Sequence, residues 1–100
     1  MSLAFVPVNR AWFEEISSGR CRVELRAATP HWLRWLLPAK RVVFVNGYRP
    51  TSPRLCFEIL EVDVVPASTL SPDVLRAHGF ERSQDVIRIV LGDVVDQPWK

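Results

Sequence analysis

The nine-residue segment SGRCRVELR, residues 18–26, gathers three arginines, one glutamate and one cysteine. A guanidinium group is a planar fork of hydrogen-bond donors that suits phosphate and carboxylate groups. A carboxylate can act as a general base, and a thiol among cations can ionise more readily and become a nucleophile. The candidates are Arg20, Arg22 and Arg26 for anion binding, and Glu24 and Cys21 for catalysis.

A second group of candidates lies in residues 46–54, NGYRPTSPR. The Asn-Gly pair and the two prolines are typical of a turn-rich loop. Phosphates need cations and unstacked bases need flat rings, so Tyr48 and Arg49 are candidates for a loop-borne lid over a ligand. Asn46 either contributes to ligand binding or simply favours the tight turn.

The formal net charge of +2 conceals a polarised distribution. Residues 1–54 carry nine Lys and Arg against three Glu, whereas residues 55–100 carry four Lys and Arg against eight Asp and Glu. Eleven of the thirteen cations are arginine, the side chain that best recognises phosphate and also stacks on rings. The codon bias of a GC-rich genome is the alternative explanation for this arginine content.

The elements that must position these residues are short. Helix-start signals occur at Asn9, at Thr29 with Pro30, and in the segment SPDVLRAHG, residues 71–79. Gly19 and Gly79 are expected to end the first and third helices. Strands are expected at residues 3–8, 22–25, 41–45, 55–65 and 85–95.

Two of these strands are irregular by pattern. Apolar residues of the fourth lie at positions 55, 57 and 59 and then at 60, 62 and 64, so its inward face switches between Ile59 and Leu60. A bulge or sharp bend there would let one long strand serve a curved sheet. Gly92 is expected to interrupt the last strand.

The segment WFEEISSGRCRVELR resembles the signature of the ASCH domain, a relative of the PUA RNA-binding fold. In that family an aromatic-bearing helix leads into a Gly-x-Lys-x-x-Glu-x-Arg motif. Gly19, Glu24 and Arg26 match this motif, and Cys21 stands at the lysine position. The later segments TPHWLRWL, VVFVNGYRPTSPRLCFEI and IRIVLGDVV are similar to an ASCH subgroup with a Pro-aromatic-Trp helix and an Asn-Gly-Tyr loop.

The resemblance implies one α+β domain over residues 1–100: a PUA-like, partly open β-barrel with about three short flanking helices and a cleft between them. ASCH members are suggested to bind RNA or nucleotide-like ligands. We therefore expect such a ligand as the partner, no cofactor, and a basic cleft in which Arg22, Glu24 and Arg26 read the ligand. The sequence leaves the oligomeric state open.

Two other functions remain open. Some ASCH proteins hydrolyse acylated nucleosides or RNA, and this chain would need Glu24 with a replacement nucleophile to do so. In that branch a lysine at position 21 activates a neighbouring threonine, whereas this chain has Cys21, Arg22 and Val23. Loss of the catalytic lysine favours binding over catalysis. The third alternative is a protein-interaction module whose basic half meets an acidic partner.

Several candidates also have a structural interpretation. Glu24 and Arg26 share one side of a strand and can form an ion pair that braces a helix to the barrel. Three aromatic residues at helical spacings are expected to anchor the core, and both histidines are expected to face solvent. These residues are Trp12, Phe13 and Trp32 for the core, and His31 and His78 for the surface.

The motif poses a geometric conflict at Cys21. In a regular strand Cys21 would face away from Glu24 and Arg26, although the family motif directs position 21 into the cleft. We therefore predict that residues 19–22 are irregular, that the regular strand begins near Val23, and that both groups converge on one pocket.

Composition narrows the setting. The chain has no run of about 18 uncharged apolar residues, and MSLAFVPVNR lacks the pattern of a signal peptide, so we expect a cytoplasmic protein with no membrane partner. Cys21 and Cys56 match no metal-ligand spacing, so no metal site is expected. A disulfide between them is disfavoured in the cytosol.

Overall fold

The computed structural model describes residues 3–95, which form five strands and three α-helices. The strands are β1 (Leu3–Pro7), β2 (Val23–Ala27), β3 (Arg41–Val45), β4 (Arg54–Pro66) and β5 (Asp85–Val95). The helices are α1 (Arg10–Ser17), α2 (Pro30–Leu36) and α3 (Pro72–His78), with a 3-10 turn, η1 (Ala67–Thr69), before α3.

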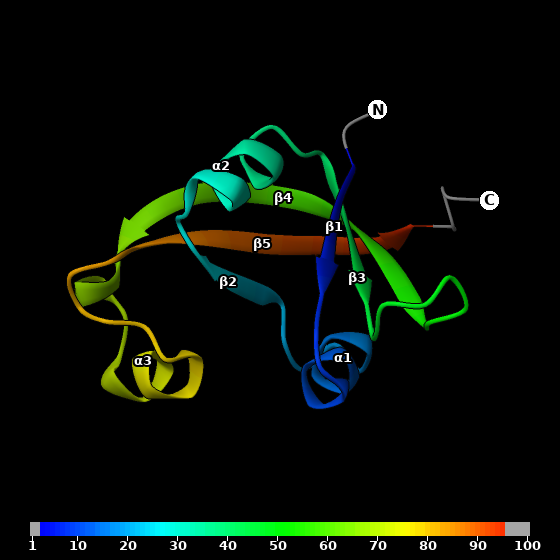
Figure 1. Cartoon of the computed structure of the whole chain (residues 1–100), viewed down its shortest axis with the longest axis horizontal. Coiled ribbons are helices and arrows are strands. Elements are labelled where there is room, and N and C mark those ends of the chain that lie inside the picture. Colours follow the sequence, from blue (N-terminus) through cyan, green and yellow to red (C-terminus); the bar gives the residue numbers. More distant parts are fainter. Residues whose placement is uncertain (1–2, 96–100) are drawn as a thin grey trace.

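The strands form one mixed sheet in the order β1-β3-β4-β5-β2 (Figure 1). Strand β1 is parallel to β3, and all other neighbouring strands are antiparallel. The long strands β4 and β5 curve through the middle of the molecule, so the sheet is a half-barrel whose edges are β1 and β2. The expected α+β class and partly open barrel with three short helices are confirmed.

Local capping sets the start of each α-helix. The side chain of Asn9 accepts a hydrogen bond from the backbone N–H of Trp12, at 2.9 Å. The hydroxyls of Thr29 and Ser71 cap α2 and α3 in the same way, each followed by a proline at the first helical position. Gly79 ends α3 with φ 71°, a left-handed conformation that glycine adopts without a Cβ penalty.

The curvature of the sheet comes with irregular pairing of β4 and β5. The register shifts between Phe57 and Ile59 and again between Ile59 and Glu61, which confirms the predicted bulge. The inward face resumes at Val62 rather than at Leu60, whose side chain is 68% exposed. The switch of face therefore comes later than the sequence pattern suggested.

The prediction that Gly92 interrupts the last strand is wrong, because β5 runs through it without a break. Phe57 pairs with Val94 and Ile59 pairs with Leu91, so β5 holds an extra residue at this point and Gly92 lies in the bulge. A Cβ at position 92 would lie 2.9 Å from Cδ2 of Leu60. Because Gly92 has no side chain, the side chain of Leu60 can lie close to the backbone of β5 at this point.

The main core lies between the sheet and helices α1 and α2. Each of these elements contributes fully or almost fully buried side chains. They include Ile16 of α1, Leu36 of α2, Phe44 of β3, Phe57 of β4 and Ile87 of β5. Within residues 3–95, no helix is long and apolar enough to cross a membrane.

Phe44 and Tyr48 lie four residues apart and should respond oppositely to truncation. Phe44 is fully buried and contacts Phe57 edge-on at 5.9 Å between ring centroids, so Phe44→Ala should lower the free energy of unfolding by about 3–5 kcal/mol. Tyr48 is 91% exposed, and Tyr48→Ala should change the same free energy by less than about 0.5 kcal/mol. Urea unfolding followed by circular dichroism measures both; equal losses would contradict the core assignment.

Candidate functional site

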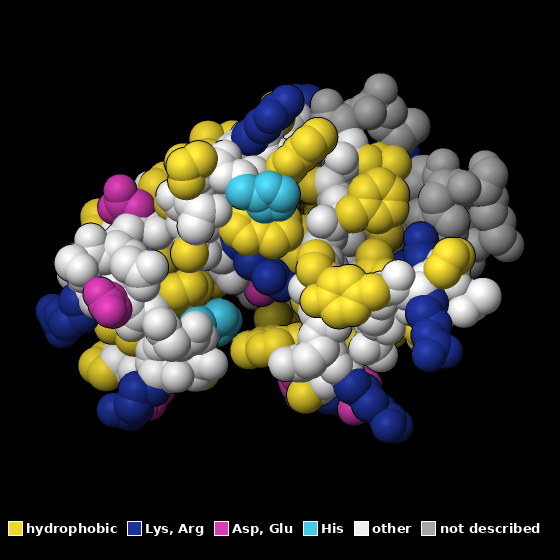
Figure 2. All heavy atoms as spheres, in the orientation of Figure 1, with side chains coloured by type: hydrophobic (Ala, Val, Ile, Leu, Met, Phe, Trp, Pro, Cys, Tyr) yellow, Lys and Arg dark blue, Asp and Glu magenta, His cyan; other side chains and the backbone are white. Residues whose placement is uncertain are grey.

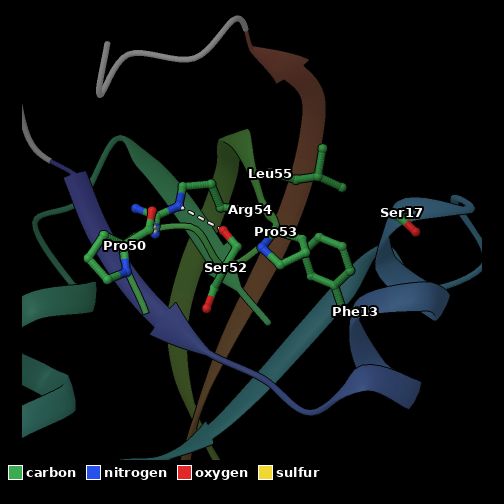
Figure 3. A pocket seen from close by; sticks show the side chains of 7 residues that line it. All are labelled: Phe13, Ser17, Pro50, Ser52, Pro53, Arg54 and Leu55. Carbon is green, nitrogen blue, oxygen red and sulfur yellow. Dashed lines mark hydrogen bonds between the residues drawn. The ribbon is translucent and has the colours of Figure 1, made fainter. Parts of the chain in front are cut away.

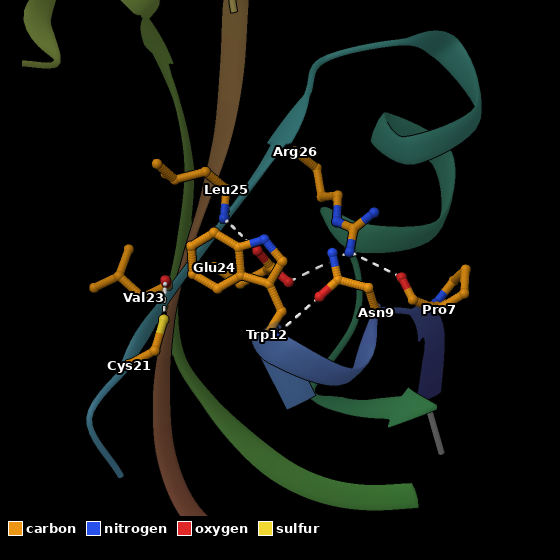
Figure 4. A network of polar contacts seen from close by, with 8 residues as sticks. All are labelled: Pro7, Asn9, Trp12, Cys21, Val23, Glu24, Leu25 and Arg26. Atoms are coloured by element: carbon orange, nitrogen blue, oxygen red, sulfur yellow. Dashed lines mark hydrogen bonds and ion pairs between the residues drawn. The ribbon is translucent and has the colours of Figure 1, made fainter. Parts of the chain in front are cut away.

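Glu24 and Arg26 project from the same side of β2, as their spacing predicts (Figure 4). Glu24 is only 6% exposed, and its Oε1 accepts a hydrogen bond from the backbone N–H of Leu25 at 3.0 Å. Its Oε2 lies 3.4 Å from Nη2 of Arg26. The carboxylate is thus compensated on both oxygens, which a buried charge requires.

Arg26 has further contacts. Its Nη2 also donates to the carbonyl oxygen of Pro7, at 3.0 Å, and its Cζ lies 5.4 Å from the ring centroid of Trp32. The predicted structural ion pair therefore exists, and the bond to Pro7 also braces β2 against β1. The same guanidinium packs against α2 through a cation–π contact.

This pair lies in a pocket of about 390 Å³ between the sheet and all three helices, which we call the edge pocket. Figure 2 shows the pocket as a hollow between α1 and α3, with a cationic and an anionic side chain at its floor. The lining residues are Pro7, Val8, Asn9, Trp12, Glu24, Leu25, Arg26, Ala27, Trp32, Ala77, His78 and Phe80. The volume falls in the range of small-molecule sites.

Aromatic rings form much of its wall. The rings of Trp12 and His78 lie 5.1 Å apart, and His78 stacks on Phe80 at 5.2 Å with an interplanar angle of 10°. Trp32 contributes a fourth ring from α2 and also packs against the main core, as does Phe13. The prediction that Trp12 is a core anchor is wrong, since Trp12 lines the edge pocket outside the buried core cluster.

The prediction that His78 faces solvent is also wrong. Its side chain is half-buried, and Nδ1 lies 3.1 Å from the carbonyl oxygen of Val74. A carbonyl can only accept, so Nδ1 carries the proton and, in the neutral ring, Nε2 is an acceptor. The spacing of four between Val74 and His78 places both on one helical face, which was the available sequence signal. His31 is exposed, as predicted.

Arg20 and Arg22 are placed elsewhere. Arg20 is exposed and pairs with Glu15 at 3.1 Å. Arg22 donates to the carbonyl oxygen of Gly92 at 3.3 Å. Neither residue is part of the described lining of the edge pocket. Both remain candidates only for contacts outside it.

The loop residues Asn46, Tyr48 and Arg49 also lie outside the edge pocket lining. The backbone N–H of Asn46 bonds the carbonyl oxygen of Pro53 and closes the base of the loop. Tyr48 and Arg49 line a separate hollow of about 370 Å³ beside β1. The structure therefore offers no contact by which these two residues close over Glu24 and Arg26.

A larger hollow of about 550 Å³ separates α1 from the same loop (Figure 3). Its charged lining residue, Arg54, donates to the carbonyl oxygens of Arg49, Pro50 and Ser52. These bonds hold the loop in shape. The other lining side chains are Phe13, Ser17, Pro50, Ser52, Pro53 and Leu55, which offer little specific chemistry.

One of the two predictions for Cys21 is confirmed. Residues 18–22 are irregular and β2 begins at Val23, as expected. The expected convergence on one pocket is wrong, because Cys21 packs against the main core and its thiol donates to the carbonyl oxygen of Val23 at 3.1 Å. Burial raises the pKa of the Cys21 thiol, and the carboxylates of Glu24 and Glu15 raise it further. The neighbouring arginines do not activate this thiol.

The basic half of the chain is partly neutralised by its own glutamates. Glu14, Glu15 and Glu24 pair with Arg10, Arg20 and Arg26, respectively. Arg41 pairs with Glu58 across β3 and β4. Among the described residues of this half, the exposed cations outside these ion pairs are Arg22, Arg34, Lys40 and Arg49.

Comparison with known proteins identifies the fold. No protein-family model and no curated protein sequence matches the chain. Two crystal structures of single-residue mutants of ZmASCH from Zymomonas mobilis are similar, each with a TM-score of 0.68 at 20% identity. They cover 92% and 93% of this chain, and 68% and 70% of the ZmASCH chains. The resemblance to a particular ASCH subgroup stays a prediction.

Arg26→Ala should destabilise the protein. It removes the bond to Pro7 and leaves the buried carboxylate of Glu24 without its cation, so the free energy of unfolding should fall by about 2–4 kcal/mol. Adding Glu24→Gln should recover part of this loss, because the uncompensated charge is then gone. A double-mutant cycle in urea measures the coupling; additive losses would show that the pair is not energetically linked.

Cys21 should be slow to alkylate at neutral pH. Because its pKa is raised, the thiolate fraction at pH 7–8 lies below that of free cysteine, and the rate should climb only at more alkaline pH. Iodoacetamide labelling of the Cys56→Ala variant, followed by mass spectrometry from pH 7 to 10, gives the midpoint. A midpoint more acidic than that of free cysteine would restore Cys21 as a nucleophile.

Proposed function

The chain has the fold of an ASCH domain, and on this premise we propose that it binds RNA or a nucleotide-like ligand in the edge pocket. The observation that carries the proposal is the combination of four aromatic rings with a compensated Glu24–Arg26 pair in one hollow. A nucleobase presents two flat faces and a polar edge. The pocket supplies partners for both kinds of surface.

The rings suit the faces of a base. Trp12 enters from α1, Trp32 from α2, and His78 with Phe80 from the end of α3, so rings line the hollow from three directions. Stacking of a base on an aromatic ring contributes about 1–3 kcal/mol. Such stacking tolerates any base, so specificity must come from polar groups.

The polar groups suit the edge of a base. Each carboxylate oxygen of Glu24 retains a lone pair beyond its present hydrogen bond and can accept from an exocyclic amino group. Nε2 of His78, an acceptor in the neutral ring, can take a hydrogen bond from the base. Arg26 is anchored by Glu24 and Pro7, which fixes its guanidinium before a ligand arrives.

Catalysis has less support than binding. Cys21 lies outside the pocket lining with a raised pKa, so the enzyme alternative would need Glu24 to act with a nucleophile from elsewhere, such as water. A cytoplasmic location belongs to the proposal and rests on the sequence, in which MSLAFVPVNR lacks the pattern of a signal peptide. The salt dependence of RNA binding, which is tested below, distinguishes RNA binding from the protein-interaction alternative.

Nucleotide binding should be detectable by NMR. Titration with the four ribonucleoside 5′-monophosphates should shift the backbone amides of α1, β2 and the end of α3. Trp12→Ala should weaken this binding by about tenfold, as expected for the loss of one stacking partner. Leu60→Ala, which truncates an exposed side chain of β4, is the matched control and should leave it unchanged.

A short single-stranded RNA should bind in the same pocket, with affinity that falls as salt rises, because phosphate contacts release counterions. Fluorescence anisotropy at 50 and 200 mM salt tests this. Absence of shifts with every nucleotide and of RNA binding at the lower salt would overturn the proposal. Conversion of a nucleoside or RNA during the titration, detected by chromatography, would overturn the binding proposal in favour of the enzyme alternative.

A further inference from the structure

Strand β1 carries an apolar row on its outward face. Burial alternates along the strand, with Ala4 and Val6 buried and Leu3, Phe5 and Pro7 on the opposite side. Phe5 is 50% exposed. A strand with one face in the core and one in water normally places polar residues on the outer face, so this row is unusual for a solvated surface.

The row connects three hollows. Leu3 and Phe5 line a hollow of about 460 Å³ with His31, Trp32 and Trp35 of α2. Phe5 and Pro7 line the hollow of about 370 Å³ that contains Tyr48 and Arg49. Pro7 and Trp32 both continue into the edge pocket. The three hollows therefore adjoin one another through these shared residues.

We call the surface formed by the outward row, α2 and the β3–β4 loop the β1 face. Figure 2 shows hydrophobic side chains gathered over β1, with cationic side chains above them at α2 and beside them at the β3–β4 loop. Strand β1 is five residues long, about 17 Å at the usual rise. Stacked nucleotides advance about 3.4 Å each, so the face has room for several.

Aromatic rings on this face are unusually accessible. Trp35 is 50% exposed and Tyr48 is 91% exposed. Arg34 lies over the ring of Trp35, with Cζ 5.4 Å from the centroid. Single-stranded nucleic acids bind to such alternations of exposed rings and arginines.

The charge of the β1 face favours an anionic occupant. The described residues that line its two hollows include arginines at the loop end and no Asp or Glu. Arg34 adds a cation at the α2 end. The exposed apolar residues of β4 and β5, Leu60, Val64 and Val94, contrast with this arrangement because they are all aliphatic.

We infer that the β1 face binds a single-stranded RNA of several nucleotides, as an extension of the edge pocket. Bases stack on Trp35, Phe5 and Tyr48, while phosphates run past Arg34 and Arg49. The bases must be unpaired, because duplex bases do not expose their faces. The inference rests on the proposed function, because a base bound in the edge pocket sets the orientation of the RNA along the β1 face.

The test is the dependence of affinity on ligand length. Binding of 5′-uridylate and of oligouridylates of two, four and eight nucleotides is measured by calorimetry at 50 mM salt. Affinity should rise with length. Trp35→Ala and Tyr48→Ala should each weaken the octamer by about fivefold or more, as expected for the loss of a stacking partner, and leave 5′-uridylate within about twofold.

A charge pair of variants tests the phosphate contacts. Arg49→Glu should weaken the octamer and lower the salt dependence of its binding. Arg82→Glu, at an exposed cation beyond α3, is the matched control. It should leave the octamer affinity at the wild-type value. Equal effects of the two variants would reduce the interaction to net charge and overturn the inference.

The outcomes separate the two proposals. If the octamer binds no tighter than 5′-uridylate, or Trp35→Ala and Tyr48→Ala have no effect, the β1 face is not an RNA surface, whatever the pocket binds. If Trp12→Ala is neutral while Trp35→Ala weakens the octamer, the pocket proposal fails and the face remains. Self-association abolished by Trp35→Ala, without octamer binding, would identify a protein interface and overturn the inference.

Discussion

A side-chain hydrogen bond joins the two edges of the sheet: Nη2 of Arg26, on β2, donates to the carbonyl oxygen of Pro7, at the end of β1. The order β1-β3-β4-β5-β2 places these strands at opposite ends of the sheet, so their approach requires the whole half-barrel to curve. The bulges in β4 and β5 permit that curvature. Arg26 then holds the edges together while Glu24 compensates its charge.

The edge pocket follows from this closure. Arg26 joins β2 to the end of β1, close to the start of α1, so Asn9 and Trp12 lie beside Glu24. Helix α2 places Trp32 against the guanidinium of Arg26. The hydrogen bond from Arg26 to Pro7 and the ion pair with Glu24 hold β2 near β1, and side chains only partly fill the space beside them, which is the edge pocket. Structural and binding roles therefore fall on the same residues, and stability and affinity must be measured separately for any variant of Arg26.

Features set by neighbouring residues were predictable from sequence, and features set by distant contacts were not. The caps at Asn9, Thr29 and Ser71 are bonds over three residues, and all three occur where expected. His78 was misassigned because its surroundings come from Trp12, sixty-six positions earlier, and from Phe80 beyond the helix. The irregular start of β2 was predicted, but the direction of Cys21 depends on core packing that no local pattern encodes.

The charge asymmetry of the sequence acquires a physical interpretation in this topology. Nine of the twelve residues that line the edge pocket, and all described residues that line the two hollows of the β1 face, belong to the basic half of the chain. The acidic half forms β5 and most of β4, where Arg88 bridges to Asp63 at 2.7 Å and, through this hydrogen bond, lowers the pKa of the Asp63 carboxyl. A codon bias would raise arginine throughout the chain. It does not explain why nine of thirteen cations precede residue 55, in the half that supplies both edges of the sheet and the surfaces that lie along them.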